Sequence, residues 1–184
     1  QPPTTPRPCA KMKVLSPLLL LLAKATAAAD YPAPVCNVVD FGARGDNTTD
    51  DAPAVRRAIA AAPSPCATIL FPRGRTFVLG SVPLRNGLTV AVEGAIRAAP
   101  NGQHAYDCIE HNPWAHYQDF GHTYFRNSLF WGISVENVTV TGGGTIWGDS
   151  LTTGETAPGD GNKMFAFRSS KNVRLERLRL IRGG

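Results

Sequence analysis

Three acidic residues and four histidines lie in one segment, residues 98–128, where side chains of these types could serve a reaction or hold a metal. The acids are Asp107, Glu110 and Asp119, and the histidines are His104, His111, His116 and His122. The acids could face a bound substrate, although solvated acids on a surface loop are the simpler interpretation. The histidines lack the spacing of metal ligands, so we expect surface or hydrogen-bonded histidines, no metal site and no cofactor.

The same segment holds two aromatic residues, Trp114 and Tyr117, which could stack on a sugar ring or pack beneath the loop. A basic stripe follows near the end of the sequence, made of Arg168, Lys171, Arg174, Arg177, Arg179 and Arg182. It could bind the carboxylates of an acidic polysaccharide or the phosphates of RNA, and an outward-facing strand is the interpretation that needs no ligand. No nucleic-acid recognition motif accompanies the stripe, so we expect no nucleic-acid partner.

Residues 1–29 are predicted to be a leader and signal peptide. A basic segment starts at Met12-Lys13, residues 14–22 are almost wholly apolar, and Ala27-x-Ala29 fits the small-residue rule for cleavage. The apolar run is too short to span a bilayer as a helix; a buried apolar segment is the alternative. We therefore expect a secreted chain with one domain over residues 30–184 and no membrane anchor in the mature form.

Removing that segment changes the charge of the chain. The full sequence has 19 basic and 14 acidic residues, a formal net charge of +5. Residues 1–29 contain four of the basic residues and no acid, which leaves 15 basic against 14 acidic residues and a net charge of +1. The basic balance of the whole sequence is thus no sign of nucleic-acid binding.

Of the four cysteines, Cys9 would be removed with the leader. An oxidising compartment would then allow one disulfide and leave one thiol among Cys36, Cys66 and Cys108. We expect Cys36 to pair with Cys66, because Cys36 begins one predicted strand and Cys66 precedes another. Two Asn-x-Thr sequons, at Asn47 and Asn137, are N-glycosylation candidates if the chain is secreted.

Residues 50–62 are predicted to form the one helix. Asp50 suits its N-cap, Asp51 favours the positive end of the helix dipole, and Pro53 is tolerated in the first turn. The core stripe of this helix would be Val55, Ala58, Ile59 and Ala62. Strands are predicted over residues 68–71 and 76–79 and, with a less clean alternation, over residues 88–92.

A weak repeat follows the helix. Leu88, Val138 and Val173 align at intervals of 50 and 35 residues, which are one repeat each if residues 98–128 and 148–163 are insertions. In the last repeat the alternation of apolar residues breaks at Glu176-Arg177, as it would at a corner between two strands. Recurring short strands with Asn or Gly at corners predict a right-handed parallel β-helix; chance similarity among Gly-rich β segments is the alternative.

Several of these segments resemble glycoside hydrolase family 28, the polygalacturonase-like pectin enzymes. VVDFGARGDNTTDDAPAVRRAI resembles the family's opening strand, Gly-rich turn and capping helix, and ATILFPRGRTFVLGSVPL resembles its next strands. ENVTVTGGGTIWG is similar to a later coil, and YQDFGHTYFRNSLFWG and GNKMFAF are similar to a subgroup in plants and bacteria. The resemblance covers residues 35–184. It implies an all-β fold, a single-stranded right-handed parallel β-helix that is truncated here, with one N-terminal capping helix.

The opening motif contains Arg44-Gly45-Asp46, the tripeptide that cell-adhesion ligands present to integrins. Gly42 and Gly45 supply the unusual backbone angles of a tight turn, and Arg44 lies between them. We therefore interpret the tripeptide as part of a turn.

The resemblance also implies inverting hydrolysis of galacturonan by two carboxyl groups. The family's Asn-x-Asp and Gly-His-Gly motifs are absent, and the only Asp-Asp pair, Asp50-Asp51, starts the predicted helix. We assign no catalytic residue and expect this chain to be an inactive fragment of such an enzyme. Substrate contacts are expected at Trp114, Tyr117 and Lys163, the partner is an acidic polysaccharide (pectin or galacturonan), and the chain is expected to be an extracellular monomer. The alternative is a non-catalytic β-helix or pseudoenzyme that binds acidic polysaccharide.

Overall fold

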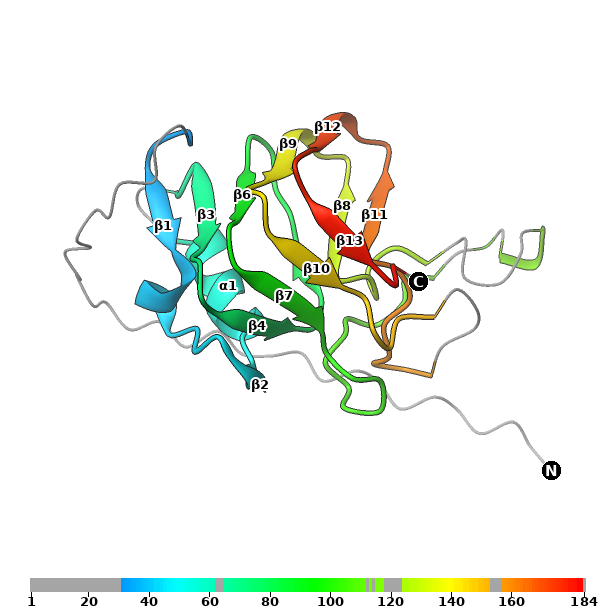
Figure 1. The fold of residues 1–184 in the computed structure, drawn as a ribbon. Coiled ribbons are helices and arrows are strands. Elements are labelled where there is room, and N and C mark those ends of the chain that lie inside the picture. The colour runs from blue at the N-terminus through cyan, green and yellow to red at the C-terminus, as the bar shows by residue number, and fades with distance from the viewer. Residues whose placement is uncertain are drawn as a thin grey trace.

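The computed structural model describes residues 31–61, 65–111, 113, 115–117, 124–152 and 157–183. In this part of the chain, short strands follow one another around one hydrophobic core and pair in three parallel sheets (Figure 1). The predicted leader and signal peptide lie outside the described residues. None of the helices in the described ranges is long and apolar enough to cross a membrane.

Each sheet is built from strands that are far apart in the sequence. The first sheet, in spatial order, contains β1 (Val35–Asn37), β3 (Thr68–Phe71), β6 (Thr89–Val92), β9 (Glu136–Thr141) and β12 (Lys171–Leu175). The second contains β13 (Arg179–Ile181), β10 (Thr145–Trp147), β7 (Ala95–Ala98), β4 (Thr76–Leu79) and β2 (Asp46–Asp50). The third contains β11 (Phe165–Arg168), β8 (Phe130–Ile133) and β5 (Val82–Pro83). The helices are η1 (Val38–Phe41), α1 (Ala52–Ile59) and η2 (Ala115–Tyr117).

The chain visits the three sheets in a fixed order. From β3 onward, successive strands fall in the first, second and third sheet, and this cycle repeats until β13. Every strand pair in the described residues is parallel, as successive coils of one solenoid require. The fold is the predicted right-handed parallel β-helix with one α-helix.

The pairing register confirms the repeat intervals. Thr89 pairs with Thr139, so one interval is 139 − 89 = 50 residues. Val138 pairs with Val173, so the next is 173 − 138 = 35 residues. The predicted corner is also present, because β12 ends before Glu176 and Arg177 adopts a positive φ of 51°. Both insertions leave the second sheet and return to the third, after β7 and after β10.

The core is a set of side-chain stacks that run across the coils. In the second sheet, Phe77, Ile96, Ile146 and Leu180 are successive register partners. The first three are fully buried, whereas Leu180 in the last coil is 47% exposed. Burial therefore depends on having a coil on both sides.

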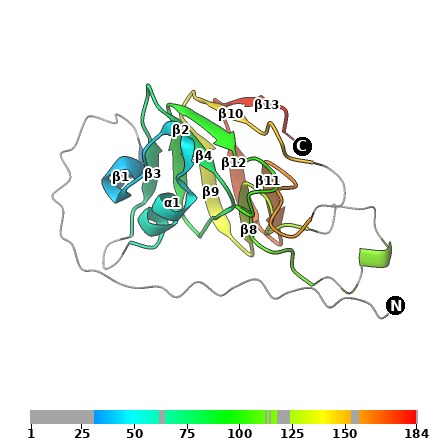
Figure 2. The same ribbon diagram turned by 90° about the horizontal axis from the view of Figure 1, so that it is seen from below.

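Helix α1 covers the other end of the stack. It packs against η1, β3 and β5, and Figures 1 and 2 show it at the end opposite β12 and β13. Val55, Ala58 and Ile59 are buried as predicted, while residue 62 lies outside the described residues. The prediction was wrong at the start of the helix, because Asp50 belongs to β2 and Asp51 occupies the N-cap position.

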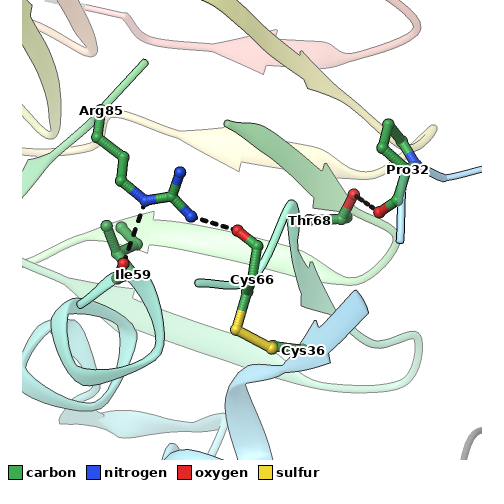
Figure 3. Close-up of a disulfide and its surroundings, with 6 residues drawn as sticks. All are labelled: Pro32, Cys36, Ile59, Cys66, Thr68 and Arg85. Atoms are coloured by element: carbon green, nitrogen blue, oxygen red, sulfur yellow. Dashed lines mark hydrogen bonds between the residues drawn. A yellow bond between two sulfur atoms is a disulfide. The ribbon is translucent and has the colours of Figure 1, made fainter. Parts of the chain in front are cut away.

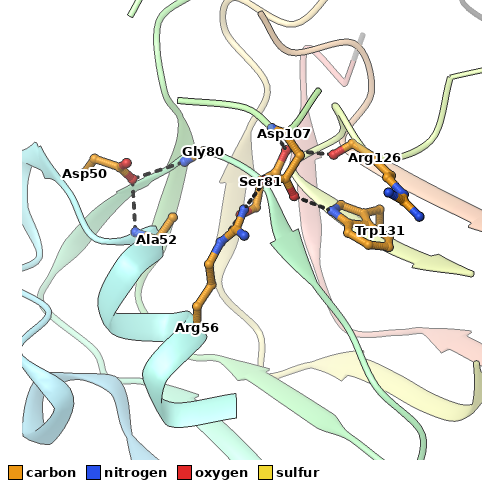
Figure 4. Close-up of polar contacts among 8 residues, drawn as sticks. All are labelled: Asp50, Ala52, Arg56, Gly80, Ser81, Asp107, Arg126 and Trp131. Atoms are coloured by element: carbon orange, nitrogen blue, oxygen red, sulfur yellow. Dashed lines mark hydrogen bonds and ion pairs between the residues drawn. The ribbon is translucent and has the colours of Figure 1, made fainter. Parts of the chain in front are cut away.

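Asp51 does not cap the helix with its side chain. Its two carboxylate oxygens instead accept hydrogen bonds from the backbone N–H groups of Arg44 at 2.6 Å and Gly45 at 2.9 Å. Asp50 supplies the missing acceptor, because its Oδ1 accepts from Ala52 N at 3.0 Å and from Gly80 N at 3.2 Å (Figure 4). Asp50 thus caps the helix with its side chain, as the sequence suggested, although it belongs to β2 and Asp51 stands at the N-cap position.

The Arg-Gly-Asp tripeptide leads from the turn at Gly42 into β2, which begins at Asp46, and the two glycines of this segment have the unusual backbone angles that were predicted. Gly42 and Gly45 have φ values of +94° and +60°, and a Cβ on Gly45 would lie 2.8 Å from the Phe77 ring. The Asp46 carboxylate accepts hydrogen bonds from the backbone and hydroxyl groups of Thr48 and Thr49. These bonds, first of all the one from the Thr49 backbone, hold the pKa of Asp46 well below its usual range.

A disulfide joins Cys36 to Cys66 and ties β1 to the start of β3 (Figure 3). Arg85 reinforces this region, because it donates to the carbonyl oxygens of Ile59 and Cys66. Cys108 is also disulfide-bonded, so the expected unpaired thiol is absent among the described cysteines.

Candidate functional site

Two adjoining depressions lie where β7 and β10 end, with volumes of about 310 and 450 Å³. Such volumes are typical of small-ligand pockets. Both are lined by Asn47, Arg97 and Asp149. The other lining residues are Thr48, Thr76, Val78, Ala98, Pro100, Gln103, Trp147 and Ser150. The lining therefore combines strands of the second sheet with residues from both insertions.

Alternation along neighbouring strands directs Arg97 and Trp147 to the outer face of the second sheet. The preceding residues, Ile96 and Ile146, are fully buried register partners. Because successive side chains of a strand face opposite sides, Arg97 and Trp147 both face outward. They are themselves register partners, so a guanidinium and an indole project from adjacent strands.

Among the described residues, Asp149 is the only acid that lines the depressions, and it is ion-paired. Its Oδ2 accepts a hydrogen bond from Arg97 Nε at 2.8 Å and lies 2.6 Å from Arg97 Nη2. Arg182 Nη1 lies 4.0 Å from the other carboxylate oxygen. Arg97 Nη1 also donates to Asn47 Oδ1 at 3.3 Å. Two guanidinium groups face one carboxylate, so the site has a surplus of positive charge.

This arrangement suits binding better than hydrolysis. A planar guanidinium presents paired donors to a carboxylate, and an aromatic face can pack against a sugar ring. Glycoside hydrolysis needs two carboxyl groups on either side of the scissile bond. Of the residues that the structure describes, only Asp149 brings a carboxyl group to the depressions, and its charge is already matched by Arg97.

The structure does not bring the predicted contact residues together in these depressions. Trp114 lies outside the described residues. Tyr117 is 73% exposed in η2, and its ring lies 3.8 Å from the His116 ring, centroid to centroid. Lys163 Nζ donates to Tyr124 O at 3.0 Å and to Asn162 Oδ1 at 2.6 Å, and burial lowers the pKa of Lys163. Neither Tyr117 nor Lys163 lines the depressions.

Asp107 holds the first insertion in place (Figure 4). Its Oδ1 lies 2.8 Å from Arg56 Nη2 of α1, and its Oδ2 accepts from Trp131 Nε1 of β8 at 3.0 Å. Arg56 also donates to the carbonyl oxygen of Ser81, whose hydroxyl donates to Arg126 O. Asp107 is thus a bridging residue, in contrast to the solvated acid expected from the sequence.

Glu110 is likewise engaged in positioning the insertion. Its side chain is only 8% exposed, and its Oε2 accepts from the backbone N–H groups of Phe125 at 3.3 Å and Arg126 at 3.2 Å. Arg168 Nη1 lies 3.9 Å from the other oxygen. The expectation of a solvated acid was wrong here too, because backbone N–H groups of Phe125 and Arg126 and the Arg168 guanidinium surround this carboxylate. Asp119 lies outside the described residues.

The described histidines of the first insertion are hydrogen-bonded or exposed. His104 Nδ1 lies 2.9 Å from Pro158 O, while His111 and His116 are exposed. No group of three potential metal ligands occurs among the described residues.

The six basic residues of the predicted stripe are all exposed, but they are spread over β11, β12, β13 and their corners, in three sheets. They surround the last coil and do not form one stripe.

Sequence reasoning missed Arg97, Trp147 and Asp149. A signal was available, since aligning Gly-Ala-Ile96 with Gly-Thr-Ile146 places Arg97 and Trp147 at the same repeat position. No comparable signal identifies Asp149, because an insertion residue has no counterpart in the repeat.

Comparisons with known proteins agree with this architecture. Residues 35–177 match the family model described as rhamnogalacturonase A/epimerase, pectate lyase-like. A polygalacturonase from Persea americana is 30% identical over 122 residues, which are 63% of this chain and 22% of the relative. The chain therefore spans about a fifth of that relative's length.

Two solved structures share the fold. An exopolygalacturonase from Thermotoga maritima has a TM-score of 0.61 at 21% identity, covering 82% of this chain and 42% of the other. A family 28 exopolygalacturonase from Yersinia enterocolitica has a TM-score of 0.61 at 18% identity, covering 79% and 34%. Since the family model matches most of the chain, this protein belongs to the rhamnogalacturonase A/epimerase, pectate lyase-like family and is a polygalacturonase-like β-helix protein.

Proposed function

We propose that this chain forms the first coils of a secreted, pectin-degrading glycoside hydrolase and that it binds acidic polysaccharide without cleaving it. The family membership supports a carbohydrate ligand. The chain's small share of the length of its polygalacturonase relative supports a role as part of a longer enzyme. An oxidising, extracellular location fits the Cys36–Cys66 disulfide.

The observation that carries the proposal is the cluster of Arg97, Trp147 and Asp149 on the outer face of the second sheet. Asp149 forms an ion pair with the Arg97 guanidinium, and Arg182 lies within ion-pair distance of the same carboxylate. A uronate carboxylate can share these guanidinium groups while its ring packs against Trp147. The second sheet contains one strand from each successive coil, side by side. A polysaccharide on its outer face can therefore extend across several coils.

Hydrolysis is not expected from the described residues. An inverting glycosidase holds its two carboxyl groups roughly 6.5–9.5 Å apart so that a water fits between them. Asp107 and Glu110, the loop acids that could have served, are committed to Arg56, Trp131 and backbone N–H groups. Within the described part of the chain, the proposed polysaccharide site therefore lacks a second carboxyl group to act with Asp149.

Galacturonate oligomers provide the test. Their binding to the purified chain would be measured by calorimetric titration and compared with binding of uncharged oligosaccharides of the same length. Arg97→Ala should weaken binding of galacturonate oligomers by about tenfold or more, as expected for loss of a charge-assisted hydrogen bond. The matched control is Arg174→Ala, which removes an exposed cation from the first sheet.

The two variants separate the proposal from general electrostatics. Selective loss of binding in Arg97→Ala would support the outer-face site. Equal losses in Arg97→Ala and Arg174→Ala would show attraction to the net charge alone. Equal affinity for charged and uncharged oligomers would contradict recognition of an acidic polysaccharide.

A further inference from the structure

We propose that Asn47 is an N-glycosylation site whose glycan occupies the depressions beside Arg97 and Trp147 and competes there with polysaccharide. The competition rests on the polysaccharide binding of the proposed function, whereas the modification rests only on the secretory route that it includes. The starting point is an overlap in the structure. Two residues of the sequon Asn47-Thr48-Thr49, Asn47 and Thr48, line the larger depression, and Asn47 lines both.

The geometry of Asn47 is compatible with an attached sugar. The residue is exposed in β2 with a φ of 65°, and its Oδ1 accepts a hydrogen bond from Arg97 Nη1 at 3.3 Å. Glycosylation uses Nδ2 and leaves the amide carbonyl intact, so this hydrogen bond can persist in the modified residue. It then holds the attachment nitrogen at the rim of the depressions.

The donor in this modification is a lipid-linked oligosaccharyl diphosphate, and the bonds formed and broken are balanced. Asn47 Nδ2 forms a bond to the anomeric carbon of the first sugar while the bond from that carbon to the diphosphate oxygen breaks. The diphosphate leaves with the electron pair, and Nδ2 loses one proton. No oxidant or reductant is consumed, and the residue gains a bulky, uncharged group.

A tethered sugar at this place is an effective competitor. A ligand on a short flexible tether has an effective concentration of the order of millimolar, with no cost of bringing two molecules together. The Trp147 indole lies in the smaller depression, where the first sugar rings can pack against it. Even a weakly held glycan would therefore displace part of a polysaccharide that binds at the same guanidinium and indole.

The second sequon provides a matched control on another face. Asn137 lies in β9 of the first sheet, and its Oδ1 accepts from Asn172 Nδ2 at 2.9 Å. Neither Asn137, Val138 nor Thr139 lines the depressions. A glycan at Asn137 would add the same mass and chemistry without covering Arg97.

The experiment uses the full chain secreted from a eukaryotic host that attaches N-glycans. Peptide mapping before and after enzymatic glycan removal identifies the occupied asparagines. Thr49→Ala removes the sequon and leaves Asn47 with its hydrogen bond to Arg97 in place, Thr49→Ser keeps the sequon, and Asn137→Gln is the matched control. Affinity for galacturonate oligomers is then measured for each secreted protein. Thr49→Ala is compared in place of enzymatically treated protein, because enzymatic removal would convert Asn47 to a charged aspartate.

We expect a glycan on Asn47 in the parent, Thr49→Ser and Asn137→Gln proteins. Thr49→Ala should bind the oligomers several-fold more tightly than these three. An unmodified Asn47 peptide in the secreted parent would overturn the site. Equal affinities of the glycosylated parent and Thr49→Ala would overturn the competition. If Thr49→Ala shows no binding at all, the proposed function and the competition both fail, while occupancy of Asn47 is still decided by the mapping.

Discussion

Ile96 in the middle of the solenoid and Leu180 in its last coil occupy equivalent positions in one stack, yet only Ile96 is buried. Both face inward in the second sheet and both pair with Ile146. Ile96 is covered by coils on either side and is fully buried, whereas Leu180 is 47% exposed. The sequence pattern is the same at the two positions, so the difference comes from stacking alone. In a solenoid, a residue's contribution to stability is set by the coils next to it.

The same contrast separates the two ends of the stack. At the first end, α1 and the Cys36–Cys66 disulfide cover and fasten the coil. At the last coil, Leu175 and Leu180 are exposed, and the neighbouring side chains include several arginines. Charged side chains on an edge strand oppose pairing with other chains, which suits an edge that the described residues leave open.

The largest effect on stability is expected from truncating Ile96, and truncating Leu180 is its matched comparison. Ile96→Ala leaves a cavity between two coils and should lower the free energy of unfolding by about 3–4 kcal/mol. Leu180→Ala removes a half-exposed side chain and should cost below about 1 kcal/mol. Urea unfolding followed by circular dichroism measures both. Comparable losses for the two variants would mean that Leu180 is covered in solution.

The disulfide at the closed end should contribute slightly less. Cys36 and Cys66 are 30 residues apart, so their bond restricts a sizeable loop of the unfolded chain. Replacing both by alanine should destabilise the oxidised protein by about 3 kcal/mol. The control is unfolding under reducing conditions, where parent and variant should converge. A difference that survives reduction would assign the loss to packing of the cysteine side chains.

The pKa values of two acids close to the start of α1, Asp46 and Asp51, should be shifted in opposite directions. Burial raises the pKa of Asp51, although the Arg44 and Gly45 N–H groups oppose this, whereas hydrogen bonds from Thr49 and Thr48 lower the pKa of Asp46. The contribution of Asp46 to folding stability is present above the unfolded-state pKa of about 4 and is lost as the pH falls through its lower folded-state pKa. That of Asp51 is present below about 4 and is lost as the pH rises through its raised folded-state pKa.

Carboxyl-carbon NMR titration resolves the two groups. Asp51 should titrate above Asp46, and Asp46→Asn should remove the lower transition and also lower the upper one, because the Asp46 charge helps to raise the pKa of Asp51. The reverse order would indicate that the N–H donors around Asp51 outweigh its burial.

The sequence predicted the repeating part of this fold well and the irregular part poorly. The strands over residues 68–71 and 76–79 and the intervals of 50 and 35 residues are correct, because apolar alternation and coil stacking are repeated signals. The start of α1 was misplaced because the sequence does not reveal that Arg44 and Gly45 bind Asp51. The roles of Asp107 and Glu110 were missed for the same reason, since their partners come from α1, β8 and the far end of the insertion.

The sequence did not predict the candidate site, for a related reason. Arg97 and Trp147 become neighbours through the register of β7 with β10, and Asp149 joins them from an insertion that has no periodicity. A site assembled from two neighbouring coils and an insertion can be found in one sequence only after the coil register is known.

The most direct test of the account is to measure polysaccharide binding and cleavage in the same sample. Purified residues 30–184 are mixed with polygalacturonic acid, binding is followed by affinity electrophoresis, and reducing-end release is assayed over the same period. Because Asp149 lacks a second carboxyl group, the account predicts retention of the protein by the polymer with no reducing-end release above a blank. Release well above the blank that disappears in Asp107→Asn, Glu110→Gln or Asp149→Asn would contradict it and assign catalysis to this chain.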